Sequence, residues 1–118
     1  MTNAANFRDI ALSFPNVEEG KHAGQPDFRI GGRKFATLAS IDEGYGNLPL
    51  TTEIQAAFVA DAPEIFIPIR GGFGRMGHTH IVLAKADHAT LAGALRASYN
   101  LRVERNVKPK KKAAPNRK

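Results

Sequence analysis

The sequence predicts an α+β fold, a two-layer sandwich in which an antiparallel sheet of about five strands carries helices mainly on one face. Apolar residues recur at helical spacing near the start, in the middle and towards the end of the chain. Between these segments lie strand-like stretches joined by glycine-rich turns, which connect antiparallel neighbours. The length of 118 residues suits a single core. The predicted order is α-β-β-(β)-α-β-β-α.

The first half of the chain is predicted to hold one helix and two or three strands. The apolar face of the helix is formed by Phe7, Ile10, Ala11 and Phe14. Thr2 or Asn3 can cap this helix, and Pro15 ends it. The stretch PDFRIGGRKFATLASI alternates around Gly31-Gly32, a dipeptide suited to a tight hairpin turn, and YGNLPL can supply a further strand.

The second half is predicted to hold two helices and two strands. Thr51 or Thr52 caps the helix EIQAAFVADA, which Pro63 ends, and EIFIPIR and HTHIVLA read as strands. Asp87 caps the final helix, HATLAGALRASYN. Side chains at these periods are predicted to form one core, made of Phe7, Ile10, Phe14, Phe28, Ile30, Phe35, Ile54, Phe58, Ile67, Ile81, Leu83, Leu91 and Leu95.

Residues 108–118, KPKKKAAPNRK, differ in composition from the rest of the chain. They hold six of the 17 Lys and Arg residues and no acid, whereas residues 1–107 hold 11 Lys and Arg and all 11 Asp and Glu. We therefore predict one domain over residues 1–107 and a disordered basic tail over 108–118. Such a tail either keeps the protein in solution or contacts a polyanion.

Composition excludes several classes of function. The chain contains no Cys, which excludes disulfides, thiolate zinc sites and thiol catalysis. No apolar run approaches the roughly 20 residues of a membrane span. The opening MTNAANFRDI lacks the basic and apolar blocks of a secretory signal. We expect a cytoplasmic protein that does not bind membranes.

The segment IRGGFGRMGHTHIVLAKAD, residues 69–87, contains the spacing Gly72-x-Gly74-x-x-Gly77 of a dinucleotide-binding loop. That loop requires a helix that begins at its end, because the helix amides hold the pyrophosphate. Here HTHIVLA reads as a strand, so we expect no helix to begin at Gly77. A kinase-type glycine loop does lie between strands, but the catalytic and metal-binding loops of that chemistry are missing. The segment is interpreted as a hairpin or bulged connection.

His78 and His80 are candidate metal ligands, because residues at i and i+2 of a strand project from the same face about 7 Å apart. A metal site needs a third and usually a fourth ligand. His22, Asp27 and Asp42 supply these only if the fold brings them there. We therefore predict no structural metal and no cofactor. Since no nucleophile elbow or buried acid pair is visible, we also predict that the protein is not an enzyme.

Cations accompany both glycine-rich turns. A two-residue turn at Gly31-Gly32 places Arg29 directly across from Lys34. Like charges in opposite positions destabilise a sheet, so this pair persists where solvent screens it or where an anion lies between. Arg70 and Arg75 flank the second connection. Each hairpin therefore presents a basic tip, which either binds an anion or is an ordinary solvated surface.

The stretches LSFPNVEEG, PDFRIGGRKFATL, GRMGHTHIVL and ASYNLRV resemble the MmcQ/YjbR family, over residues 7 to about 104. The most specific block runs from Phe28 to Ala36, where family members look like FRVGGK.FA. The resemblance implies a two-layer α+β fold similar to frataxin-like CyaY, with a "double-wing" arrangement proposed to bind DNA. The two hairpins would be the wings. A tryptophan is usual near the second hairpin, but His78 or His80 stands there and the chain has no Trp.

We therefore predict a small DNA-binding module that contacts duplex phosphates and reads no base sequence. The predicted contacts are Arg29, Arg33, Lys34, Arg70, Arg75, His78, His80, Lys108, Lys110, Lys111 and Lys112. The alternative is a module that binds a protein or a small molecule on the open face of the sheet, by analogy with CyaY-like and secretion-chaperone-like folds.

Overall fold

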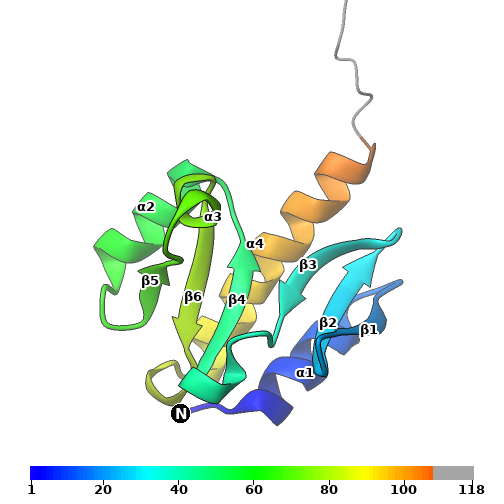
Figure 1. Ribbon diagram of the computed structural model, residues 1–118, viewed down its shortest axis with the longest axis horizontal. Helices are drawn as coiled ribbons and strands as arrows, with labels where there is room; N and C mark the ends of the chain where they lie inside the picture. The colour runs from blue at the N-terminus through cyan, green and yellow to red at the C-terminus, as the bar shows by residue number, and fades with distance from the viewer. Residues whose placement is uncertain (108–118) are drawn as a thin grey trace, which may run out of the picture.

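One antiparallel sheet forms the framework of the molecule, for which the computed structural model describes residues 1–107 (Figure 1). Its six strands lie in the order β1-β2-β3-β4-β6-β5. They are β1 (Glu18–His22), β2 (Gln25–Ile30), β3 (Arg33–Thr37), β4 (Tyr45–Pro49), β5 (Phe66–Pro68) and β6 (His78–Val82). The helices are α1 (Ala4–Ser13), η1 (Ile41–Glu43), α2 (Thr52–Asp61), α3 (Gly72–Arg75), η2 (Leu83–Lys85) and α4 (His88–Val107). The predicted disordered tail, with Lys108, Lys110, Lys111 and Lys112, lies outside the described residues.

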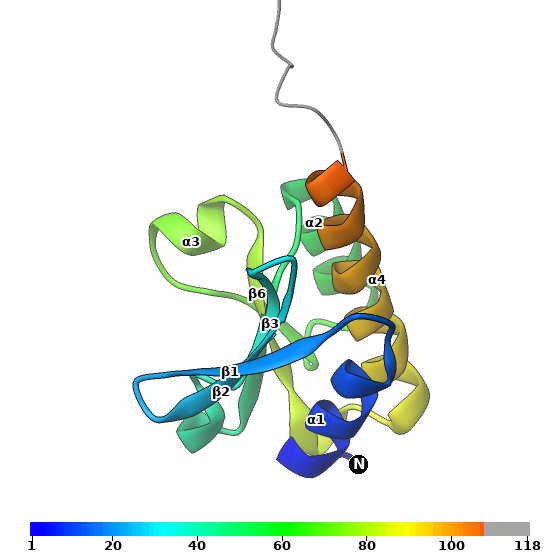
Figure 2. The same ribbon diagram turned by 90° about the vertical axis from the view of Figure 1, so that its right-hand side faces the viewer.

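The helices α1, α2 and α4 cover one face of the sheet, whereas the short α3 stands on the other side (Figure 2). Helix α4 packs against β3, β4 and α1, and α2 packs against β5 and β6. This arrangement confirms the predicted two-layer α+β fold with helices mainly on one face. We call the face opposite α1, α2 and α4 the open face.

Polar side chains cap the helices α1, α2 and α4, and they show which of the predicted caps is used. Asn3 caps α1, because its side-chain oxygen accepts from the Asn6 amide at 2.9 Å. Thr2 is instead buried and donates its hydroxyl to the Leu83 carbonyl at 2.8 Å. Thr51 caps α2 through the Ile54 amide at 3.1 Å, and Asp87 accepts from the Thr90 amide at 2.7 Å, as predicted. The bonds to Asn3, Thr51 and Asp87 each satisfy an amide that has no partner within its own helix.

The edge strand β1 was not predicted, because the sequence indicates only a polar connection there. Its side chains are almost all exposed, so neither of its faces needs apolar residues and no hydrophobic period marks it. The sheet consequently has six strands rather than about five.

Helix α4 also differs from the sequence prediction. It continues past the predicted end at Asn100 to Val107, and Val103 packs against the core. Neither α4 nor any other helix within residues 1–107 is long and apolar enough to cross a membrane.

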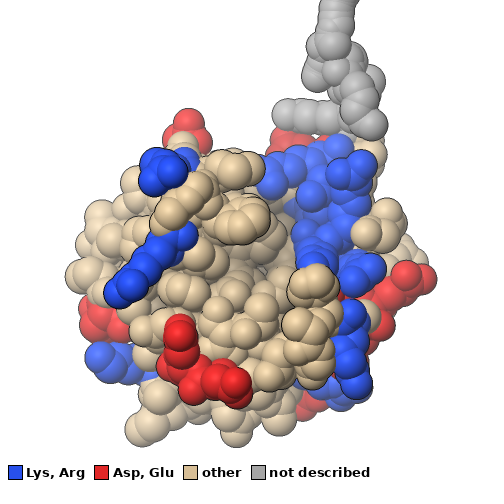
Figure 3. Space-filling model, in the orientation of Figure 1, with Lys and Arg blue, Asp and Glu red and all other residues tan. Residues whose placement is uncertain are grey.

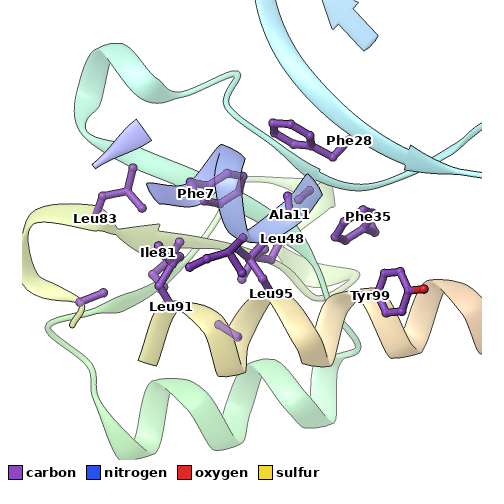
Figure 4. Packing of buried hydrophobic residues seen from close by; sticks show 14 of the residues in the cluster. Phe7, Ala11, Phe28, Phe35, Leu48, Ile81, Leu83, Leu91, Leu95 and Tyr99 are labelled. Carbon is purple, nitrogen blue, oxygen red and sulfur yellow. The ribbon is translucent and has the colours of Figure 1, made fainter. Parts of the chain in front are cut away.

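The core lies between the sheet and the helices α1 and α4 (Figure 4). The predicted core residues that are buried are Phe7, Ile10, Phe14, Phe28, Phe35, Ile81, Leu83, Leu91 and Leu95. The predicted residues that pack partly buried against them are Ile30, Ile54 and Phe58. The prediction for Ile67 is wrong: Phe66 is buried instead, while Ile67 pairs with His80 on the open face. Ile65, Phe66 and Ile67 are consecutive apolar residues, so their sequence hides which of them faces inward.

Strands β3 and β4 meet at a single register pair, Thr37 opposite Asn47. The two strands diverge beyond it, and α4 passes behind them (Figure 1). Side chains from the C-terminal half of α4 therefore reach the open face. Arg102 and Arg105 line the same groove as Thr37 and Asn47.

Candidate functional site

A row of mainly polar side chains crosses the open face from β2 to β5. It consists of Asp27, Thr37, Asn47, His80 and Ile67. Each of these residues is the cross-strand partner of the next, and such partners point to the same face of a sheet. The residues next to them in β4 and β6 are buried on the core side. The centre of the open face is therefore polar, in contrast to the core.

The carboxylate of Asp27 lies between two cations of the first hairpin. Arg29 is directly across from Lys34, as predicted. The Arg29 guanidinium donates to Asp27 at 2.8 and 3.1 Å, and the Lys34 ammonium lies 3.7 Å from the same carboxylate. The hydrogen bonds from Arg29 hold the pKa of Asp27 below its ordinary value, although burial opposes this shift. Asp27 is therefore the anion that allows Arg29 and Lys34 to face each other. The hydrogen-bonding groups of Arg29 that face Asp27 are occupied by this contact.

Two local features of the sequence make room for this cluster. The register shifts by one residue within the hairpin, where β3 contains Phe35 as an extra residue. The bulge lets Phe35 and Ala36 both face the core, so that Lys34 and Thr37 on either side of them lie on the open face opposite Arg29 and Asp27. On β1, a Cβ at Gly20 would lie 2.7 Å from a carboxylate oxygen of Asp27. Glycine at this position leaves space for the ion pair.

The connection between β5 and β6, residues 69–77, contains a short helix that the sequence did not predict. Gly71 has φ 80° and Gly77 has φ 108°, and the four-residue α3 lies between them. As predicted, no helix begins at Gly77, because β6 starts at His78. The interpretation as a simple hairpin or bulged connection is corrected: positive φ angles at both ends let the chain turn out of the sheet, form α3 and return.

Side-chain and backbone packing fix this connection against α2. The Gln55 amide nitrogen lies 3.1 Å from the Gly74 carbonyl and 2.9 Å from the His78 carbonyl. Gly74 is buried so tightly that a Cβ there would overlap the Ile69 carbonyl oxygen. The connection nevertheless presents Phe73 with 64% of its surface exposed. It is thus a fixed projection with an apolar tip.

The two histidines lie on the same face of β6, as predicted, and this face is the open face. A ring nitrogen of His80 is 2.7 Å from the Asn47 amide oxygen, and the ring stacks on Tyr45 with centroids 4.5 Å apart. The His78 ring packs against Phe73 with centroids 5.2 Å apart. Burial lowers the pKa of both histidines; for His78 the nearby Arg105 adds to this effect, whereas for His80 the charge of Glu43 opposes it. Among residues 1–107, no cluster of three or more His, Cys, Asp or Glu is placed to hold a metal.

A groove of about 500 Å³ lies on the open face between the first hairpin, α4 and the β5–β6 connection. Its lining consists of Lys34, Thr37, Ala39, Asn47, Pro49, Ile69, Phe73, His78, Arg102 and Arg105. One wall is cationic and the opposite wall is aromatic. A second hollow, which includes Arg70, Tyr45 and His80, adjoins it at Ile69.

The YjbR family model matches residues 12–101. The chain belongs to the YjbR family. A solved structure with a similar fold is the crystal structure of Deinococcus radiodurans protein DR2400, described by the family-model domain DUF419. It has 18% sequence identity and a TM-score of 0.72, and the match covers 92% of this chain and 83% of that one. No curated protein matches this chain.

In this member of the YjbR family, one side of the groove carries a cluster of cations that we call the α4 rim: Arg33, Lys34, Arg102 and Arg105. Arg33, Arg102 and Arg105 line a common hollow next to the groove. Partial burial, followed by the charges of Arg105 and Arg33, lowers the pKa of Arg102. No described acid forms an ion pair with Arg33, Arg102 or Arg105.

The other side of the groove carries Arg70 and Arg75, which we call the α3 rim because they belong to the connection that holds α3. Both residues are exposed. Figure 3 shows a hollowed area without charged atoms between two groups of Lys and Arg, with acidic atoms gathered below it. The fold of this YjbR protein therefore brings together predicted residues that lie far apart in the sequence.

Arg102 and Arg105 are absent from the sequence prediction, because the final helix was expected to end before them. Their spacing at i and i+3 in LRVERNV is the signal that could have found them, since such residues share one helix face. Phe73 was missed as well, because it was taken for part of a turn. Its position between two arginines in a short segment gives no hint of the groove.

Proposed function

We propose that this protein is a non-enzymatic, cytoplasmic DNA-binding module that contacts the phosphate backbone with the α4 rim and the α3 rim. The observation that carries this proposal is the gathering of Arg33, Arg102 and Arg105 without an acidic partner among the described residues. Residues 1–107 hold equal numbers of acidic and basic residues. The rims are therefore a local excess of positive charge on a body that is neutral overall, which is the electrostatic footprint of a polyanion site.

Phosphate contacts position a protein on DNA without specifying bases, so the rims account for affinity rather than sequence preference. Arg29 and Lys34 share the carboxylate of Asp27 and contribute less than their charges suggest. Arg33, Arg102 and Arg105 are expected to dominate the first contact. The family resemblance is consistent with the same surface, because the two wings that it implies would be the β2–β3 turn and the β5–β6 connection.

The test is the salt dependence of duplex binding, measured by fluorescence anisotropy on the full chain and on residues 1–107. Each phosphate contact adds about −0.9 to the slope of log K against log salt. We expect residues 1–107 to keep weak binding with a slope of about −2 to −4, while the tail lysines add further nonspecific affinity. Replacing Arg102 and Arg105 by Gln should reduce the size of the slope by about 2.

The matched control replaces Lys21 and Lys85 by Gln, which removes the same charge at exposed positions outside the groove. We expect the control to change the slope far less than the change in α4 does. Loss of all binding with residues 108–118, or equal effects of the two double variants, would show that the rims are not a DNA contact.

A further inference from the structure

The groove between the two rims has a composition that phosphate contact alone does not require. Lys34, Arg102 and Arg105 form one wall, and the rings of Phe73 and His78 belong to the opposite wall. Of the described residues that line the groove, none is acidic. Its volume of about 500 Å³ lies within the roughly 300–1,000 Å³ of small-molecule sites. The groove thus pairs an anion-binding wall with an apolar ring surface.

Phe73 offers a stacking surface at the mouth of this groove. It is 64% exposed, and its contact with the His78 ring is tilted at 54°. An exposed aromatic ring offers a face on which a planar base can stack. The hydrogen bonds of Gln55 and the close packing of Gly74 hold the backbone on either side of Phe73. The ring is therefore presented on a fixed support.

Polar groups lie on the floor of the groove between the two walls. The Asn47 amide is oriented by His80 at 2.7 Å and by Ser40 at 3.0 Å. The Thr37 hydroxyl oxygen accepts from the Ala39 amide at 3.4 Å, which leaves its proton to donate to another acceptor. Both side chains can form hydrogen bonds with the edge of a ligand ring.

We propose that this groove binds one unpaired nucleotide, with its base against Phe73 and its phosphate against Lys34, Arg102 and Arg105. The inference rests on the proposed function, because the same cations serve both, and it adds recognition of the base. Bases of a duplex hide their faces in the stack, whereas an unpaired base can lie against an aromatic side chain. The nucleotide can be free or part of a single strand, since both offer a planar base and a phosphate.

The experiment uses the full chain and four probes: thymidine monophosphate, a short oligothymidylate, inorganic phosphate and a duplex. Binding is measured by the shifts of backbone amide resonances and by anisotropy. The test variant is Phe73→Ala, and the control is Met76→Ala, which removes a side chain of the same connection that is also 64% exposed and does not line the groove. Thermal unfolding of both variants checks that the fold is retained.

We expect Phe73→Ala to weaken binding of oligothymidylate and of the mononucleotide by on the order of 10-fold, and duplex binding by less than about 2-fold. Met76→Ala should change none of these affinities. If the mononucleotide binds as tightly as the oligothymidylate, the ligand is a free nucleotide; if the oligothymidylate binds much more tightly, the ligand is a single strand.

Equal effects of the two variants would overturn the inference, as would an inorganic phosphate affinity equal to that of the mononucleotide. If the parent chain binds oligothymidylate but not the duplex, the proposed function is refuted and the nucleotide site stands. If the parent chain binds the duplex but Phe73→Ala does not weaken oligothymidylate binding, the nucleotide site is refuted and the proposed function stands.

Discussion

Replacing Asp27 by Asn tests the ion cluster on the open face. The change keeps the shape of the side chain and removes the charge that Arg29 and Lys34 share. Hydrogen bonds to charged groups contribute about 1.5–3 kcal/mol, and breaking a buried ion pair costs about 3–5 kcal/mol. Asp27 is only 1% exposed, but Arg29 and Lys34 are 34% and 40% exposed and can regain water in the variant. We therefore expect the free energy of unfolding to fall by about 2–3 kcal/mol.

Urea unfolding at pH 7 measures this loss, with Asp42→Asn as the control at an exposed position. The control should stay within about 0.5 kcal/mol of the parent. The pKa of Asp27 is depressed in the fold, so its stabilising effect is present above the ordinary value of 3.8 and is lost as the pH falls through the folded pKa. The acid-dependent loss of stability should be smaller in Asp27→Asn than in the parent. A loss below about 1 kcal/mol at pH 7 would refute the reasoning.

The same substitution links the cluster to the proposed function. Removing the carboxylate leaves Arg29 and Lys34 without their shared anion on the open face. Under the proposed function, duplex affinity should rise in Asp27→Asn even though the fold becomes less stable, and the salt slope should steepen by about 0.9 for one additional contact. A fall in duplex affinity in a variant that remains folded would contradict this link.

Three further predictions test the fold. Gly74→Ala should lower the free energy of unfolding by about 3 kcal/mol or more, because a Cβ would overlap the Ile69 carbonyl. Its control is Gly93→Ala in α4, where a Cβ meets no neighbouring atom within 4 Å and should raise the free energy of unfolding by about 0.5–1 kcal/mol. Similar urea midpoints for the two variants would contradict this. Burial lowers the pKa of His78 and His80 below the ordinary 6.5, so the unfolded chain binds protons more readily than the folded one. The free energy of unfolding should therefore fall as the pH drops below about 6.5. This dependence on pH should be weaker in His80→Gln, and an unchanged dependence would contradict the reasoning. Phe28→Ala should cost about 3–5 kcal/mol by urea unfolding, because its side chain is fully buried, and a cost below about 1 kcal/mol would contradict its place in the core.

Local patterns in the sequence were sufficient to predict those features that depend on neighbouring residues in the chain. The turn at Gly31-Gly32 fixes its own register, so the position of Arg29 across from Lys34 could be predicted. The period of two along β6 likewise placed His78 and His80 on one face. Such features depend on a few consecutive residues and on no distant contact.

The groove could not be predicted, because it depends on how distant segments pack. Asp27 reads as one more acid in the sequence, because the space that Gly20 leaves for its two cationic partners depends on the pairing of β1 with β2. The divergence of β3 and β4 brings Arg102 to the open face, and no local period marks that divergence. The edge strand β1 could not be predicted either, because it has no apolar face and is held by its pairing with β2.

The single register pair between β3 and β4 affects how this protein folds during its synthesis on the ribosome. The sheet consists of two three-stranded halves, and α4 packs against both β3 and β4. Synthesis runs from the N-terminus, so all six strands leave the ribosome before this helix does. Neither half can complete its core until then. We expect the nascent chain to remain unfolded until α4 emerges, and then to fold in one cooperative step that closes both halves together.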